Sequence, residues 1–220
     1  MKTLGVLGGM GPAATVAFLA RVQALTPAEG DADHIRVVMD LNPQVPDRNT
    51  RPGEAEAELG RMAERLKAAG AEVLAMPCNT AHAQKPGIVA AGLPFIDMIA
   101  ATVAAAREYD ARAIGILATP GGEALYVAAL TAAGVKPVVL QGEDRDAFMA
   151  CVYGVKRGDT GVDNRAAMAR LAGALNAAGA DAVIAGCTEV PLLLDAADVS
   201  VPLVDSAEVL AEACVRACID

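Results

Sequence analysis

The chain has 220 residues, 54% of them hydrophobic, and a formal net charge of −9. A chain of this length and apolarity can bury most of its surface in one or two domains, which excludes intrinsic disorder. Its acidity and its 3% aromatic content exclude a nucleic-acid footprint, and the Gly, Pro and charges that interrupt every long apolar run exclude a transmembrane helix or a signal peptide.

Four short apolar runs in the first half predict strands of a parallel sheet. They are rich in Val, Ile and Leu without polar alternation, which is typical of strands that helices cover on both faces. A helix is expected over 54–69, where an apolar stripe ends at Gly70. The expected strands are Leu4–Leu7, Ile35–Met39, Val73–Ala75 and Phe95–Ile96.

The second half predicts the same succession of elements. A helix capped by Asp163 carries Met168 and Leu171 on its apolar face and leads directly into a strand. We expect the helices over 98–109 and 207–217 to be exchanged between the two halves. The expected strands are Ala113–Leu117, Pro137–Leu140, Ala182–Ala185 and Leu203–Val204.

The two halves repeat each other at a period of about 110 residues. Gly5 corresponds to Gly115, and Cys78 corresponds to Cys187. The prediction is an α/β protein with two pseudo-symmetric lobes, each a mainly parallel four-stranded sheet flanked by helices, and an active site in the cleft between them. The predicted lobes are 1–97 with 206–220, and 98–205.

Cys78 and Cys187 are the strongest candidates for chemistry. A lone cysteine usually fills a core, but these two follow equivalent strands, and parallel sheets bind ligands beyond the carboxyl ends of their strands. Facing lobes would place one thiol on each side of a cleft. Helix N–H groups and nearby cations are expected to favour the thiolate, which is the basic form. Asn79, Thr80 and Thr188 are expected to hydrogen-bond a polar ligand.

Two basic residues are candidates for holding a carboxylate. The proline-rich stretch 42–49 follows a strand end on the same side as Cys78, so Arg48 is either a solvated loop residue or a bidentate clamp. Lys156 is the corresponding candidate in the second half.

The five cysteines form no paired framework, and their odd number indicates reduced thiols and a cytoplasmic protein. Cys214 and Cys218 share a helix face and are expected to pack in a core. Cys151 has no polar neighbours in the sequence.

Two other kinds of site remain open. Cys78 and His82 have an i, i+4 spacing that suits a metal, but the only further histidine, His34, precedes a distant strand. The stretch 9–14 fits the G-x-G-x-x-G/A pattern of a nicotinamide dinucleotide site. It fits equally a turn that brings a carboxylate to the N-terminus of a helix beginning at Pro12.

Five motifs occur in order along the chain: Gly8-Gly-Met-Gly-Pro12, Asn42-Pro-Gln-Val-Pro-Asp-Arg48, Met76-Pro-Cys-Asn-Thr-Ala-His82, Gly154-Val-Lys156 and Gly186-Cys-Thr-Glu189. Together they resemble the aspartate/glutamate racemase family, and its aspartate racemases in particular. The resemblance runs from Leu4 to the C-terminal helix. It implies two similar α/β domains, an amino-acid racemase that uses no cofactor and no metal, and commonly a homodimer.

The same resemblance implies the roles of individual residues. Cys78 and Cys187 would be the acid/base pair, and the residues around the substrate would be Met10, Gln44, Asp47, Arg48, Asn49, Asn79, Thr80 and Lys156. Two departures concern the substrate. The family often has Thr directly after Asp-Arg, where this chain has Asn49, and its second-lobe turn often reads Thr-x-Gly-Thr, where this chain has Thr119-Pro-Gly-Gly122.

Inversion of an amino acid requires that one proton leave one face of Cα and another arrive on the opposite face, which two flanking thiols can accomplish. Aspartate is the expected substrate. The alternatives are a glutamate or broader-substrate amino-acid racemase of the same family, a nucleotide-dependent oxidoreductase and a non-catalytic dicarboxylate-binding protein.

Overall fold

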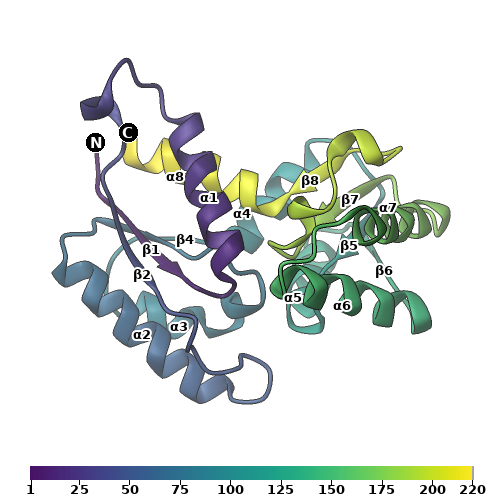
Figure 1. Ribbon diagram of the computed structural model, residues 1–220, viewed down its shortest axis with the longest axis horizontal. Helices are drawn as coiled ribbons and strands as arrows, with labels where there is room; N and C mark the ends of the chain where they lie inside the picture. The colour runs from purple at the N-terminus through teal and green to yellow at the C-terminus, as the bar shows by residue number, and fades with distance from the viewer. Residues whose placement is uncertain (220) are drawn as a thin grey trace.

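The computed structural model describes residues 1–219. Within them the chain forms two four-stranded sheets, each wholly parallel, in two lobes that lie side by side (Figure 1). The strand order is β2-β1-β3-β4 in the first lobe and β6-β5-β7-β8 in the second, so both lobes have the same topology. The strands are β1 (Leu4–Gly8), β2 (Val37–Leu41), β3 (Val73–Ala75), β4 (Phe95–Ile96), β5 (Ala113–Leu117), β6 (Lys136–Val139), β7 (Ala182–Ala185) and β8 (Leu203–Asp205).

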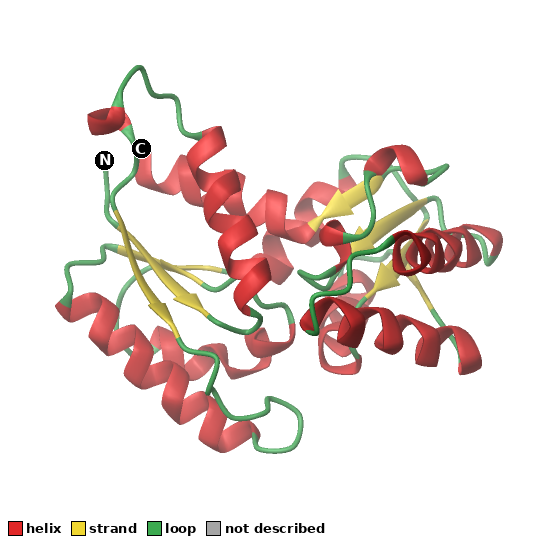
Figure 2. Cartoon of the chain, viewed as in Figure 1, coloured by secondary structure: helices red, strands yellow, loops and turns green. Residues whose placement is uncertain are grey.

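Helices cover both faces of each sheet (Figure 2). None of the helices in residues 1–219 is long and apolar enough to cross a membrane. The helices are α1 (Pro12–Leu25), α2 (Pro52–Ala68), α3 (Lys85–Val89), α4 (Met98–Arg107), α5 (Pro120–Ala132), α6 (Gly142–Lys156), α7 (Val162–Ala177) and α8 (Ser206–Ile219).

The predicted fold class is confirmed, and the predicted strands differ from the observed ones only at their ends. Proline at a first helical position explains the starts of α1 and α2, because a residue there needs no N–H for the helix ladder. The prediction that Asp163 caps a helix is wrong: Gly161 is the N-cap of α7, and Asp163 lies in its first turn. A carboxylate there still faces the positive end of the helix dipole.

The helix that follows the last strand of each sheet packs against the other sheet: α8 is distant in sequence from the first sheet, and α4 directly precedes the second. Leu210 and Cys214 of α8 belong to the core beside Leu4 of β1, and Val103 of α4 belongs to the core beside Ile114 of β5. This packing supports a proposed division into 1–97 with 206–219 and 98–205; residue 220 of the predicted first lobe lies outside the described residues. Cys214 and Cys218 are fully buried in this core, as predicted.

Candidate active site

A cavity of about 230 Å³ lies at the carboxyl ends of the strands, between loops of the two lobes. Ligands bind parallel sheets at this edge, because loops and helix N-termini gather there. Every predicted site residue except Gln44 lines the cavity: Met10, Asp47, Arg48, Asn49, Cys78, Asn79, Thr80, Lys156, Cys187 and Thr188. Gln44 is exposed on the loop, where its N–H bonds the Asn42 side chain. Thr119 and Pro120, in the turn whose sequence departs from the family pattern, also line the cavity, as do four residues that were not predicted: Met149, Val152, Tyr153 and Glu189.

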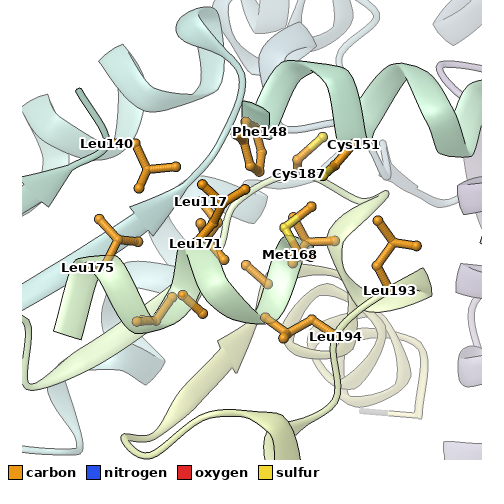
Figure 3. Close-up of a cluster of buried hydrophobic side chains, with 14 of the residues drawn as sticks. Leu117, Leu140, Phe148, Cys151, Met168, Leu171, Leu175, Cys187, Leu193 and Leu194 are labelled. Atoms are coloured by element: carbon orange, nitrogen blue, oxygen red, sulfur yellow. The ribbon is translucent and has the colours of Figure 1, made fainter. Parts of the chain in front are cut away.

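The two candidate thiols enter this cavity from equivalent positions. Cys78 follows β3 and Cys187 follows β7, the corresponding strands of the two sheets. Their exposed fractions are 5% and 7%. Cys187 lies at the edge of the second-lobe core, near Phe148 and Cys151 (Figure 3). The structure thus brings together the two thiols that the repeat singled out.

Burial raises the pKa of both thiols. At Cys78, the positive charge of Arg48 opposes this effect without cancelling it. At Cys187, the negative charge of Glu189 adds to it, and the pKa lies well above its ordinary value. The prediction that N–H groups and cations favour the thiolates is therefore wrong, because the loss of hydration outweighs them. A thiolate of high pKa is a strong base once formed, which suits a weakly acidic proton.

Glu189 is a carboxylate buried within the cavity wall, with 4% of its surface exposed. The Cys187 thiol donates a hydrogen bond to Glu189 Oε2 at 2.9 Å, and Lys156 Nζ lies 2.9 Å from Glu189 Oε1. Burial lowers the pKa of Lys156, but the charge and hydrogen bond of Glu189, together with the two neighbouring cysteines, raise it overall. The inward position of Glu189 had no local sequence signal, because the burial of this loop is visible only in the structure.

Asp47 shapes the loop that carries Arg48. Its Oδ1 accepts hydrogen bonds from the N–H groups of Asn49 and Thr50, at 2.9 and 2.8 Å, and these bonds lower its pKa. The neighbouring Arg48 has a buried Nε with no hydrogen-bond partner among residues 1–219. A buried donor without a partner carries a desolvation cost that a bound anion would relieve. The loop therefore presents a guanidinium prepared to bind a carboxylate.

Asn79 joins the two lobes through a chain of buried hydrogen bonds. The Tyr126 hydroxyl donates to Asn79 Oδ1 at 2.6 Å, and Asn79 Nδ2 donates to Ser206 Oγ at 3.1 Å. The Ser206 hydroxyl donates in turn to the Ala185 carbonyl, two residues before Cys187. Both polar ends of the Asn79 side chain are therefore occupied within the protein. Its expected contact with a ligand stays a prediction, to which the structure adds a positioning role.

The turn at the start of α5 approaches the loop that carries Asn49. A Cβ added to Gly121 would lie 2.7 Å from Asn49 Oδ1 and 2.7 Å from Thr80 Cγ2. Thr80 and Thr119 share a hydrogen bond of 2.6 Å between their hydroxyls across the lobes. Glycine at position 121 thus lets the first turn of α5 approach the loop that carries Asn49. Gly122, the residue of this turn that departs from the family pattern, makes a separate contact: a Cβ there would lie 3.3 Å from the Gly186 carbonyl oxygen.

His82 is buried beneath Cys78 and has both ring nitrogens occupied. Its Nε2 accepts a hydrogen bond from the Met98 N–H at 3.0 Å, which makes Nδ1 the donor to the Cys78 carbonyl at 2.9 Å. This arrangement leaves no ring lone pair for a metal ion, which argues against the Cys78–His82 metal site. In residues 1–219, no three His, Cys, Asp or Glu side chains are grouped as metal ligands.

Comparison with known proteins finds racemases with similar sequences and folds. A family model described as Asp/Glu/Hydantoin racemase matches residues 7–214. The chain is 26% identical to the broad specificity amino-acid racemase RacX of Bacillus subtilis (strain 168), with 96% of each chain covered. It is 31% identical to the glutamate racemase of Synechococcus sp. (strain CC9605), covering 69% of this chain and 56% of that one. The fold matches the Picrophilus torridus aspartate racemase with a TM-score of 0.88, at 28% identity, covering 99% of this chain and 94% of the other.

Proposed function

The chain belongs to the Asp/Glu/hydantoin racemase family and is an amino-acid racemase, and on this basis we propose that it interconverts L- and D-aspartate without a cofactor. The observation that carries the proposal is the convergence of Cys78 and Cys187 on one cavity that also holds Arg48 and Lys156. Similarity to the Picrophilus torridus aspartate racemase over nearly the whole chain supports aspartate as the substrate.

Arg48 is the residue that we assign to the substrate α-carboxylate. Its buried, unpartnered Nε would gain an acceptor when a carboxylate binds in a bidentate manner. Lys156 also lines the cavity, paired with Glu189, and its charge would attract the side-chain carboxylate. Both cations would also stabilise the negative charge that develops when Cα loses its proton, since a buried site screens charge poorly.

The two thiols then divide the proton transfer between the faces of the substrate. One cysteine, as thiolate, removes the Cα proton, and the other, as thiol, delivers a proton to the opposite face. The reverse reaction exchanges the two roles. Because burial raises the pKa of both groups, the active form with one thiolate is a minor form near neutral pH. We therefore expect kcat/KM to rise with pH on the alkaline side of neutrality.

The decisive experiment follows optical rotation and Cα deuteration together. Metal-free and pyridoxal-free protein is incubated in D2O with L-aspartate and, separately, with D-aspartate. Loss of rotation accompanied by deuterium at Cα in both samples is expected, because each inversion takes a new proton from the enzyme. Binding of aspartate without deuteration would identify a non-catalytic dicarboxylate-binding protein and overturn the proposal.

Replacement of each cysteine tests the two-thiol assignment. Cys78→Ser and Cys187→Ser are each expected to abolish racemisation, because a hydroxyl is a far weaker base near neutral pH. Either variant keeps one base, so it is expected to deuterate one enantiomer without inverting it. Cys151→Ala is the control, since Cys151 is buried in the same cluster as Cys187 but does not line the cavity. Full racemisation by both serine variants would eliminate the mechanism.

A broader substrate range is the second candidate, and the Lys156–Glu189 pair favours it. Glu189 already neutralises Lys156, so a second substrate carboxylate meets a partly satisfied cation. Amino acids with uncharged side chains would then lose little affinity relative to aspartate. Comparison of kcat/KM for aspartate, glutamate and alanine distinguishes the two candidates. Similar values indicate a broad racemase. A preference for aspartate of about a hundredfold or more, which is the discrimination expected from two hydrogen bonds to its side-chain carboxylate, indicates an aspartate racemase.

A further inference from the structure

Glu189 and Lys156 lie at the boundary between two cavities. Besides the cavity that contains the thiols, a second one of about 450 Å³ is lined by the β1–α1 turn, and it shares Met10, Arg48, Lys156 and Glu189 with the first. The backbone of Gly11 in that turn approaches closely, since a Cβ there would lie 3.2 Å from Glu189 Oε1. Glu189 thus has Oε2 on the Cys187 sulfur, while Oε1 contacts Lys156 and lies beside the Gly11 turn that lines the adjoining second cavity.

A two-thiol racemase ends each turnover with its two thiols in protonation states that do not allow the same enantiomer to react again. If Cys187 has delivered its proton, it remains a thiolate while Cys78 carries the proton it removed. That form is ready only for the reverse reaction. Before the same enantiomer can react again, Cys187 must regain a proton and Cys78 must lose one, and both exchanges end in solvent.

Cys187 is poorly placed for direct exchange with water. Its side chain is 7% exposed and its thiol hydrogen points to Glu189. The cavity beside the opposite oxygen of Glu189 is polar at its boundary and large enough to hold water molecules. A carboxylate between a thiol and water has the geometry of a proton shuttle, because it accepts at one oxygen and donates from the other after a small rotation.

We propose that Glu189 is the proton relay that resets Cys187 between turnovers, drawing on water in the second cavity. A water-borne proton binds Glu189, which passes it to the Cys187 thiolate and returns to the carboxylate. In the opposite direction the Cys187 thiol gives its proton to Glu189, which releases it to water. Lys156 holds the carboxylate in place and balances its charge in both steps. This relay rests on the proposed racemase function, since only a two-base enzyme needs such a reset.

The neighbouring charges agree with this role. The carboxylate raises the pKa of the Cys187 thiol, so Cys187 is a thiol when Glu189 is ionised. Cys78 has no equivalent carboxylate, because Thr80 occupies the position that corresponds to Glu189. The relay therefore serves one thiol of the pair.

Tracer perturbation measures the reset directly. Racemic radiolabelled aspartate is equilibrated with the enzyme, and a large excess of unlabelled L-aspartate is added. If reset is slow, the net flow of L to D leaves the enzyme in the form that acts on D, and label moves temporarily from D to L. For Glu189→Gln we expect a reset slowed by about a hundredfold and a large transient, because the amide cannot carry the proton.

The control variant is Glu212→Gln, which removes a carboxylate from an exposed ion pair with Arg216 on α8. It is expected to behave as the unmodified protein does. A transient in Glu189→Gln no larger than in this control overturns the relay. If Glu189→Gln does not racemise at all, Glu189→Ala is assayed with added formate: recovery of racemisation supports a relay that a small acid replaces, and failure to recover overturns it.

A second measurement keeps the relay separable from the racemase proposal. Alkylation of Cys187 by iodoacetamide is followed against pH by mass spectrometry of its peptide, with no amino acid present. Removal of the carboxylate charge is expected to lower the pKa of Cys187, so labelling of Glu189→Gln begins at lower pH than in the unmodified protein. An unchanged profile overturns the relay even if the protein racemises aspartate. A shifted profile in a protein that racemises no amino acid overturns the proposed function instead.

Discussion

Arg48 and Lys156 carry the same formal charge in very different surroundings. Lys156 has Glu189 at 2.9 Å, whereas the buried Nε of Arg48 has no partner in the described part of the chain. A bound anion therefore gains a more favourable interaction with Arg48 than with Lys156, whose charge is already paired. Arg48 also offers a planar fork, and lysine offers only a point charge.

Replacement of Arg48 by lysine is expected to lower kcat/KM for aspartate, because the charge remains but the bidentate geometry is lost. The expected decrease corresponds to a loss of about 1–3 kcal/mol of transition-state stabilisation. Steady-state kinetics with both enantiomers measure the loss. Arg51→Lys, on the same loop and in an exposed pair with Glu54, is the matched control. Equal kinetics for the two variants would place the substrate carboxylate elsewhere.

The sequence predicted which residues line this cavity better than it predicted the hydrogen bonds that these residues make. Repetition alone identified Cys78 and Cys187, since a duplicated fold places equivalent residues at equivalent strand ends. It could not show that Asn79 is bound by Tyr126 and Ser206, which are distant in the chain. Nor could it show that Glu189 faces inward, because a single acidic residue in a loop is most often solvated.

At the scale of elements, His82 ties the loop after β3 to the start of α4. Its ring accepts the Met98 N–H, one of the helix N-terminal donors without a partner inside the helix, and donates to the Cys78 carbonyl. Burial lowers the pKa of His82 below its ordinary value of 6.5. The folded protein therefore requires His82 in its neutral form, because a protonated ring could not accept the Met98 N–H.

Stability is expected to depend on this histidine below neutral pH. Between its lowered folded pKa and 6.5 the unfolded chain binds a proton that the folded protein does not, so the free energy of unfolding falls as pH decreases through that range. Urea denaturation at pH 7.5 and at several values below 6.5 measures the slope. His82→Gln is expected to lose stability at pH 7.5 and to show a flatter slope.

The chain contains one other histidine, which provides the control. His34 follows the short helical turn Asp31–Asp33, far from this cap in sequence. His34→Gln is expected to keep the slope of the unmodified protein. If the dependence of the free energy of unfolding on pH persists in His82→Gln and disappears in His34→Gln, then His82 is not the source of the acid sensitivity.

Elements were predictable where one local signal dominated. Runs of Val, Ile and Leu located the strands, because the central strands of a helix-covered parallel sheet are buried on both faces; the edge strands β2 and β6 are only partly buried. The start of α7 was missed because Asp163 has the chemistry of a cap, whereas the backbone bends at Gly161, which no side-chain preference reveals. The proposed exchange of α4 and α8 rests on the repeat and on the cores in which these helices are buried, not on a signal within either helix.

At the scale of the whole molecule, the exchanged helices make each lobe depend on the other. Leu210 of α8 is fully buried against the first sheet, yet its helix begins directly after β8 of the second. Loss of packing in the first core therefore also destabilises the second sheet, because α8 is packed in that core and continues directly from β8. We expect the two lobes to unfold together.

Leu210→Ala is expected to destabilise the protein by about 2–5 kcal/mol through the cavity it leaves. Amide hydrogen exchange of β1 and β5 reports each lobe separately. Both strands are expected to lose protection by the same factor, and Val103→Ala on α4 should give the same pattern from the opposite lobe. Faster exchange of β1 with unchanged exchange of β5 would show that the lobes unfold independently.

The unlike surroundings of the two sulfurs have a thermodynamic consequence. L- and D-aspartate have equal free energies in water, so the equilibrium constant between them is one and the two directions must share the same kcat/KM. Yet one sulfur has Glu189 beside it, and the other has Thr80 at the corresponding position. This asymmetry can alter only how each kcat/KM divides between affinity and turnover: the mirror form that binds more tightly must be released or converted more slowly, by the same factor.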